Sequence, residues 1–192
     1  MPDARDLPLF RWGEELRRLR RARRALRLRT FVAIGATLAA VAVLATLFWP
    51  PRPLLLWNAS ASSPVGLYGV EAFSAIRPGE WVIAWPPAWA RQLADKRHYL
   101  PSDVPLVKPV AAAPCDRVCA VGEAIFVNGR LRARRRRLDG AGRRLPWWTD
   151  CITLGEEQLF LLSPEADSFD GRYFGVTRRS EIIGGALLLW AR

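Results

Sequence analysis

One lysine stands apart among the residues that could do chemistry. The chain of 192 residues contains 27 arginines but only two lysines, Lys96 and Lys108. Lys108 lies in an apolar stretch, residues 104–114, and no other charge occurs between Asp103 and Asp116. Burial disfavours the charged form of an amine, and a neutral amine can act as a general base near neutral pH. The alternative is that Lys108 lies on an edge strand and extends its amine to solvent.

A cluster of serines is the second candidate. It lies in the segment Asn-Ala-Ser-Ala-Ser-Ser-Pro-Val-Gly-Leu-Tyr, residues 58–68. By itself, a run of serines followed by Pro and Gly is typical of a turn. A serine hydroxyl beside a neutral lysine amine, however, is a nucleophile–base pair that needs no histidine. The single histidine, His98, lies in a polar stretch and is expected at the surface. The serines and Lys108 together therefore predict a Ser–Lys dyad.

The rest of the composition narrows the chemistry. One histidine cannot build a multi-histidine metal site, and the three cysteines do not have the spacing of a zinc motif. We therefore expect no metal and no cofactor. The formal net charge of +11 would suit a nucleic-acid partner, but the distribution of charge along the chain matters more.

Two successive N-terminal segments have opposite character. Residues 1–30 contain ten arginines and four acidic residues, and leucines at helical spacing predict a basic amphipathic helix. Residues 31–49 carry no charge and are long enough to cross a bilayer, so we expect a transmembrane helix that ends before Pro50 and Pro51. The positive-inside rule keeps the basic arm in the cytoplasm and places residues 50–192 beyond the inner membrane, in the bacterial periplasm. The alternatives are a cleaved secretory signal for the span and nucleic-acid binding for the arm, although we expect no nucleic-acid partner.

Residues 50–192 predict one mainly β domain. Short apolar runs are bounded by Gly, Pro and Asn, and Asn128-Gly129 between two such runs is a strong signal for a two-residue hairpin. Helical periodicity appears only in residues 88–96. The arginine run 132–137 and the segment that follows it to residue 144 are expected to be an exposed loop or hairpin tip with solvated charges. A specific partner site is the alternative. The runs that predict strands are 81–85, 105–113, 124–133, 158–163 and 181–190.

Taken in order, several short motifs resemble one family. They are the serine segment 58–68, Gly79-Glu80-Trp81-Val82, the segment 106–118 around Lys108, Val127-Asn128-Gly129, and the segment 167–175. This order and spacing resemble the bacterial type I signal peptidases, most closely the conjugative-transfer branch called TraF. The resemblance covers about residues 54–190. It implies a complex all-β peptidase domain anchored by one N-terminal transmembrane helix.

The resemblance also implies a role for individual residues. Ser62 takes the nucleophile position and Lys108 the general-base position. Ser63, the adjacent serine, is the alternative nucleophile. General signal peptidases have one more residue before the proline than this motif has. The Ser60 hydroxyl and the Ser62 backbone N–H would form the oxyanion hole. The supporting residues would be Ser168, which orients the lysine amine, and Asp170 and Arg172, which form a structural ion pair near the site.

The cysteines and two departures from the family pattern complete the predictions. Three cysteines allow one disulfide and one free thiol, as in an exported protein, and three reduced thiols are the alternative. The resemblance implies that Cys119 and Cys151 are the bonded pair. Cys115 replaces the usual glycine of the lysine motif and would be strained if its turn needs a positive φ. Gly171 replaces a small polar residue in the last motif.

The expected function is the processing of exported precursor proteins by a membrane-anchored serine endopeptidase. The branch implies a pilin or another conjugative-transfer component as the substrate, with the peptide amine as a potential final acceptor that would give a cyclised product. Two alternatives stay open: a general leader peptidase, and a non-catalytic membrane-anchored module of a secretion or conjugation assembly. The expected partners are a membrane-bound precursor protein and the lipid bilayer.

Overall fold

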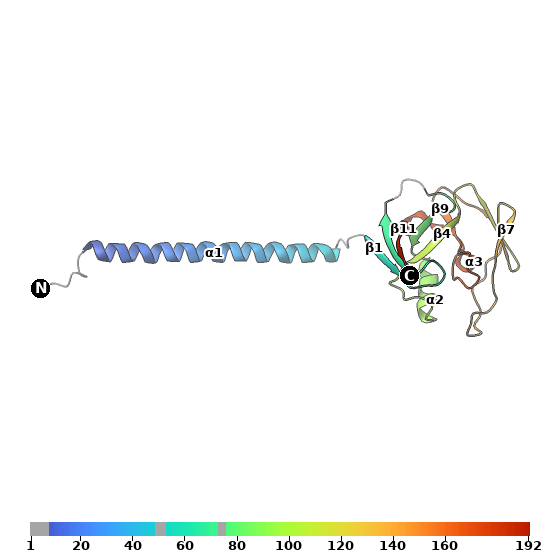
Figure 1. Ribbon diagram of the computed structural model, residues 1–192, viewed down its shortest axis with the longest axis horizontal. Helices are drawn as coiled ribbons and strands as arrows, with labels where there is room; N and C mark the ends of the chain where they lie inside the picture. The colour runs from blue at the N-terminus through green and yellow to red at the C-terminus, as the bar shows by residue number, and fades with distance from the viewer. Residues whose placement is uncertain (1–7, 49–52, 73–75) are drawn as a thin grey trace. The chain divides into compact units, whose positions relative to one another are not determined.

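The chain divides into two units, Met1–Pro51 and Arg52–Arg192. The computed structural model describes residues 8–48, 53–72 and 76–192 (Figure 1). The first unit contains one continuous helix, α1, from Pro8 to Phe48. All the strands belong to the second unit.

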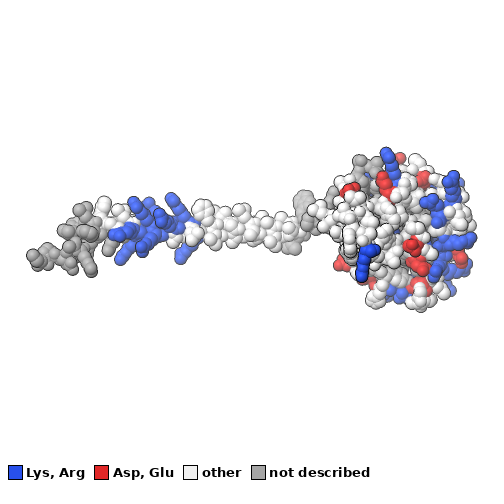
Figure 2. Space-filling view, viewed as in Figure 1, with Lys and Arg blue, Asp and Glu red and all other residues white. Residues whose placement is uncertain are grey.

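Helix α1 joins the basic arm and the apolar segment without a break. Its arginines gather over its first part, and the part that follows is uncharged (Figure 2). Residues Glu15–Thr46 include a window of mean hydropathy 2.0 that is long and apolar enough to cross a membrane, and none of this window is buried. A membrane anchor and a signal sequence share these properties. Trp49, Pro50 and Pro51, which end the predicted span, lie outside the described residues.

The larger of two antiparallel sheets contributes more buried apolar residues than the smaller one. The described strands form it in the order β1-β2-β11-β3-β4-β9-β10. A register shift between Leu188 and Trp190 marks a bulge where β11 pairs with β2. The strand bounds are β1 Leu55–Asn58, β2 Gly66–Glu71, β3 Trp81–Ala84, β4 Leu106–Ala112, β9 Gln158–Leu161, β10 Thr177–Arg178 and β11 Ile182–Ala191.

The second sheet has the order β7-β6-β5-β8. Asn128 and Gly129 join β6 to β7 with φ angles of 51° and 76°. Two positive φ values are what a type I′ hairpin turn requires, which is why Asn-Gly predicts this turn. The strand bounds are β5 Arg117–Val121, β6 Ala124–Val127, β7 Arg130–Arg134 and β8 Asp150–Thr153. The predicted mainly β fold is confirmed, and each of the five apolar runs contributes at least one strand.

Strand β4 runs through the middle of the core. Val107 packs in one apolar cluster with Tyr68 and Ile83, and Val110 packs in another with Leu161. Lys108 lies between these two valines and pairs with Val82 of β3 in the strand register. The lysine therefore starts from one of the most enclosed positions in the sheet.

Two helices complete the second unit. Helix α2, Ala88–Lys96, covers the range that its periodicity predicts. Helix α3, Gly171–Phe174, is too short for a periodic signal and starts at Asp170, whose side chain accepts a hydrogen bond from the Arg172 N–H. A Cβ on Gly171 would lie 2.6 Å from the Leu161 carbonyl oxygen, so this close approach explains the glycine in the last motif. A single 3₁₀ turn spans Arg179–Glu181.

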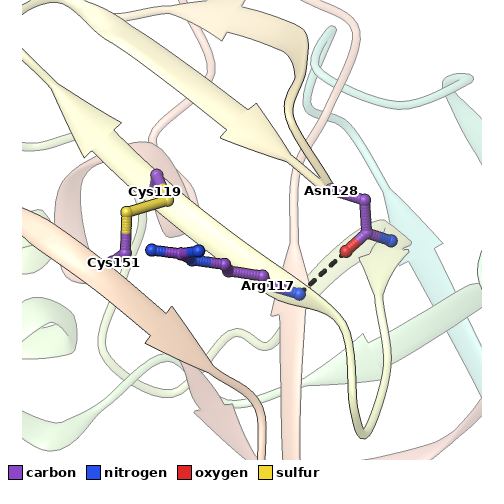
Figure 3. The surroundings of a disulfide bond; sticks show 4 residues. All are labelled: Arg117, Cys119, Asn128 and Cys151. Atoms are coloured by element: carbon purple, nitrogen blue, oxygen red, sulfur yellow. Dashed lines mark hydrogen bonds between the residues drawn. A yellow bond between two sulfur atoms is a disulfide. The ribbon is translucent and has the colours of Figure 1, made fainter.

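The cysteines fall into two states. Cys119 and Cys151 are direct partners in the pairing of β5 with β8, and they form a disulfide (Figure 3). Cys115 is free and exposed, in the turn between β4 and β5. Its φ is 71°, in the left-handed region that favours glycine. The turn therefore does impose the conformation in which a cysteine is strained.

Candidate active site

Lys108 is enclosed, and among the described residues no carboxylate contacts its amine. The residue is 1% exposed, and its Nζ lies 2.8 Å from Ser168 Oγ. Burial lowers the pKa of Lys108 to about 8, opposed by the charge of Asp170 and assisted by the charge of Arg172. A large fraction of this lysine is therefore neutral near pH 8, whereas a solvated lysine is protonated there.

The structure brings Ser62 rather than Ser63 to this amine. Ser62 lies in the loop between β1 and β2, and its Oγ is 2.5 Å from Lys108 Nζ. Ser63 is buried and turned away, since its Oγ accepts a hydrogen bond from Asn58 Nδ2 at 2.9 Å. The amine can donate to Ser168 and direct its lone pair at the Ser62 hydroxyl, which is the arrangement that a general base requires.

The residues predicted for the oxyanion hole lie next to Ser62. Ser60 Oγ is 2.8 Å from Ser62 Oγ and 3.4 Å from the Ser62 backbone N. Neither Ser60 nor Ser62 is fully buried, so both face the accessible side of the site. A hydroxyl and a backbone N–H at this spacing can donate to one developing oxyanion.

Asn58 shapes the loop that carries Ser62. Its Oδ1 accepts the Ser60 N–H at 3.1 Å, and its Nδ2 donates to the Ser60 and Pro64 carbonyl oxygens at 3.0 Å each. Tyr68 adds a hydrogen bond from its hydroxyl to the Pro64 carbonyl at 2.8 Å. One asparagine at the end of β1 thus spans the whole turn and holds Ser60 and Ser62 in place.

Asp170 and Arg172 form the ion pair that the resemblance predicts. Arg172 Nε is 2.8 Å from Asp170 Oδ1, and both residues are at most 1% exposed. Arg172 also donates to the carbonyls of Ser163 and Ala166, at 2.6 and 2.9 Å. The pair lies behind Ser168 in the segment after β9, where it fixes the backbone rather than facing the cleft.

A cleft of about 620 Å³ opens over Ser62 and Lys108. Part of its lining is an apolar wall from residues 104–107, and the far part includes Tyr99 and Asp139. The Tyr99 hydroxyl donates to the Asp139 carboxylate, and Arg143 Nε lies 2.7 Å from the same carboxylate. These contacts join the segment after α2 to the loop 138–144, so this loop forms part of the cleft wall.

The prediction that residues 132–137 are solvated charges is wrong for Arg135. This arginine is 2% exposed and lies 3.7 Å from the ring centroid of Trp147. It donates to the Gly122 carbonyl at 2.8 Å and to the Arg172 carbonyl at 3.4 Å. The Trp147 ring and the two carbonyl oxygens enclose the guanidinium. No charge pattern in the sequence predicts such a position. His98, in contrast, is exposed as predicted.

Sequence reasoning missed two groups that hold the site together. Asn58 belonged to the serine motif but received no role, although an Asn two residues before a Ser is a known turn-forming signal. Ser163 received no attention, yet its Oγ lies 2.6 Å from the Ser62 carbonyl oxygen. Nothing local marks Ser163, because the two residues are 101 positions apart in the chain.

Comparison with known proteins identifies the family of this chain. A family model described as "Signal peptidase, peptidase S26" matches residues 27–191. The chain is 34% identical over 168 residues to the plasmid transfer protein TraF of Escherichia coli, covering 82% of this chain and 92% of that protein. It is 33% identical over 138 residues to the conjugal transfer protein TraF of Agrobacterium fabrum, covering 66% of this chain and 77% of that protein.

A solved structure of a signal peptidase I from Enterococcus faecalis aligns with 14% identity and a TM-score of 0.36, covering 59% of this chain and 98% of that one. The sequence matches are the stronger finding, because the family model spans most of the chain and the relatives exceed 30% identity over most of their own length. By these matches, the protein belongs to the peptidase S26 family of signal peptidases.

Proposed function

We propose that this protein is a membrane-anchored serine endopeptidase that uses Ser62 and Lys108 to process exported precursor proteins. The observation that carries the proposal is the 2.5 Å contact between Lys108 Nζ and Ser62 Oγ, made by a lysine that is 1% exposed. A surface lysine would be protonated at neutral pH and could not accept the serine proton. A buried amine beside two hydroxyls can be neutral at this pH and can accept that proton.

The proposed reaction runs in two steps. Ser62 Oγ attacks the scissile carbonyl carbon while its proton moves to Lys108 Nζ, and the oxyanion is held by the Ser60 hydroxyl and the Ser62 N–H. The proton then passes to the leaving amine, the C–N bond breaks, and an ester to Ser62 remains. Water, or the amine of the same peptide, then gives a proton to Lys108 Nζ and attacks this ester, the ester C–O bond breaks, and the proton returns to Ser62 Oγ. Attack by water gives hydrolysis, and attack by the peptide amine gives a cyclised product.

The substrate class follows from the relatives' names. The relatives named plasmid transfer protein and conjugal transfer protein support a precursor of the conjugative apparatus, such as a pilin, as the substrate. The disulfide supports an exported domain, and the arginine-rich start of α1 supports a cytoplasmic N-terminus with the domain in the periplasm. A general leader peptidase and a non-catalytic module remain the competing functions.

An exposed apolar surface supports contact of the domain with the bilayer. Trp57 and Trp190 stack with ring centroids 5.7 Å apart and are 48% and 56% exposed. Strand β1 begins at Leu55, soon after α1 ends at Phe48, so this surface lies close in the chain to the proposed membrane exit. Exchanging both tryptophans for serine should weaken binding of the domain to vesicles, and a Leu131→Ser variant, altered at an exposed leucine of β7, is the control. Equal binding of all three proteins would argue against the contact.

The deciding experiment follows precursor processing in cells that carry the chain and a candidate pilin precursor. Ser62→Ala and Lys108→Ala should each abolish processing while membrane insertion is kept. Ser63→Ala is the matched control, because it removes a neighbouring hydroxyl that points away from Lys108. Retained processing in Ser62→Ala would exclude the dyad. Mass spectrometry of the product distinguishes a cleaved peptide from a cyclised one.

A further inference from the structure

A buried hydroxyl from a distant part of the chain donates a hydrogen bond to the backbone of Ser62. Ser163 follows β9 and is 1% exposed. Its Oγ lies 2.6 Å from the Ser62 carbonyl oxygen and accepts the Glu165 N–H at 3.2 Å. A carbonyl oxygen has no hydrogen to give, so the single hydroxyl proton of Ser163 must point at Ser62.

The backbone of Ser163 is held as firmly as its side chain. Its N–H donates to Asp170 Oδ2 at 2.9 Å, and its carbonyl accepts from Arg172 Nη2 at 2.6 Å. The buried ion pair therefore forms hydrogen bonds with both the N–H and the carbonyl of Ser163, the residue that contacts Ser62. Glu165 and Ala166 in the same segment also give backbone groups to this network.

We infer that Ser163 is a positioning residue for the nucleophile. A hydrogen bond to the Ser62 carbonyl fixes the rotation of that peptide, and with it the direction of the Ser62 side chain relative to Lys108 Nζ. The same restraint steadies the Ser62 N–H that would donate to the oxyanion. This inference rests on the proposed function, since it presumes that Ser62 attacks the substrate.

Two serines of one segment would then act on different members of the dyad. Ser168 contacts the lysine amine, at 2.8 Å, and so acts on the base. Ser163 contacts the backbone of the nucleophile and has no hydrogen bond to Lys108 in the part of the chain that the structure describes. Loss of Ser168 should therefore shift the pH dependence of the reaction, and loss of Ser163 should lower the rate at every pH.

The test uses the isosteric pair Ser163→Thr and Ser163→Val in the full-length protein, with Ser163→Ala beside them. Threonine and valine overfill the site equally, but only threonine keeps the hydroxyl. The probe is an internally quenched peptide with small residues before the scissile bond, and rates are expressed per mole of folded enzyme. We expect Val and Ala to lower kcat by roughly 10- to 100-fold, the effect of a misplaced reacting group. Thr should stay within a few-fold of the wild type.

Three readouts separate positioning from a general structural role. KM and the pH midpoint should not move in Ser163→Val, whereas Ser168→Ala should move the midpoint. Equal kcat in the Thr and Val variants would overturn the inference, and would leave the Ser–Lys proposal intact as long as the wild type cleaves the peptide. A wild-type protein that neither cleaves the peptide nor processes a precursor would overturn the proposed function first, and this inference with it.

Discussion

Each sheet has a buried cation in or next to one of its strands, and the groups that surround the two cations differ. On β4, Lys108 is 1% exposed, and the hydrogen-bond partners of its amine within the described part of the chain are the hydroxyl groups of Ser62 and Ser168. Beyond β7, Arg135 is 2% exposed and meets two carbonyl oxygens and the face of Trp147. Both positions remove a charge from water, but only the second replaces the lost water with strong acceptors.

The difference lies in which form of each side chain the surroundings favour. Carbonyl acceptors and an aromatic face stabilise the charged form, and a guanidinium cannot lose its proton in a protein. Burial lowers the pKa of Arg135, yet the ordinary pKa of an arginine is so high that the side chain stays charged at every relevant pH. Burial also lowers the pKa of Lys108, to about 8, and under the proposed mechanism this change makes the amine a base. Similar burial therefore keeps one cation charged beside the second sheet and favours a neutral amine in the first sheet.

Making the first cation permanent should have the largest effect. Lys108→Arg places a permanently charged guanidinium beside the Ser62 and Ser168 hydroxyls. Because a guanidinium cannot accept the serine proton, cleavage should fall by roughly 10⁴- to 10⁶-fold. The buried charge should also destabilise the domain. Lys108→Met is the matched control: it has similar length and no charge, so it should be equally inactive but stably folded. Peptide cleavage and thermal unfolding of both variants measure the two effects. Activity in the arginine variant would show that Lys108 is not the base.

The pH dependence should expose the lowered pKa directly. If the neutral amine is the base, as proposed, kcat/KM should rise with pH to a plateau, with a midpoint near 8 and a tenfold loss per unit well below it. The same pKa lies below the ordinary lysine value of 10.5, so the unfolded chain binds the proton more tightly and stability should rise from pH 8 to 10.5. Lys108→Met should lack this rise. A flat rate profile from pH 6 to 10 would contradict the mechanism.

The comparison also separates what the sequence could predict from what it could not. The apolar stretch around Lys108 marked it as a candidate but left an edge-strand position open, and the resemblance assigned its role. The hairpin at Asn128-Gly129 was predictable because two positive φ values favour those residue types. The strands followed from short apolar runs, and α2 from its periodicity. These are properties of neighbouring residues, which a sequence displays directly.

The groups that the sequence did not reveal depend on contacts between distant segments. Ser163 reaches Ser62 across 101 positions, and Arg135 needs Trp147 and the Gly122 carbonyl to become a buried residue. Within a run of arginines, nothing distinguishes the one that turns inward. The cysteine pair is intermediate: the resemblance assigned it, and the pairing of β5 with β8 supplies its physical reason.

Removing the second cation should cost stability rather than chemistry. Arg135→Met keeps an aliphatic stem but leaves two carbonyls without donors and removes the stack on Trp147, so we expect a loss of about 2–4 kcal/mol. Arg137→Met, at a side chain that is 75% exposed, is the control and should stay within about 0.5 kcal/mol. Thermal unfolding measures both, and the pH midpoint of cleavage should not move. A shifted midpoint in Arg135→Met would mean that the two buried cations are coupled.

The smallest expected effect lies at the turn that connects the two sheets. Cys115 has a φ of 71° and its N–H donates to the Leu154 carbonyl at 2.9 Å, so the turn is fixed in a conformation that a side chain resists. That strain costs about 1–2 kcal/mol for a non-glycine residue, and glycine gives back about half through its greater freedom when unfolded. Cys115→Gly should therefore stabilise the domain by about 0.5–1 kcal/mol, whereas Cys115→Ala removes the thiol and keeps the strain. Melting temperatures of the two variants isolate the backbone contribution, and equal values would show that this turn holds no strain to release.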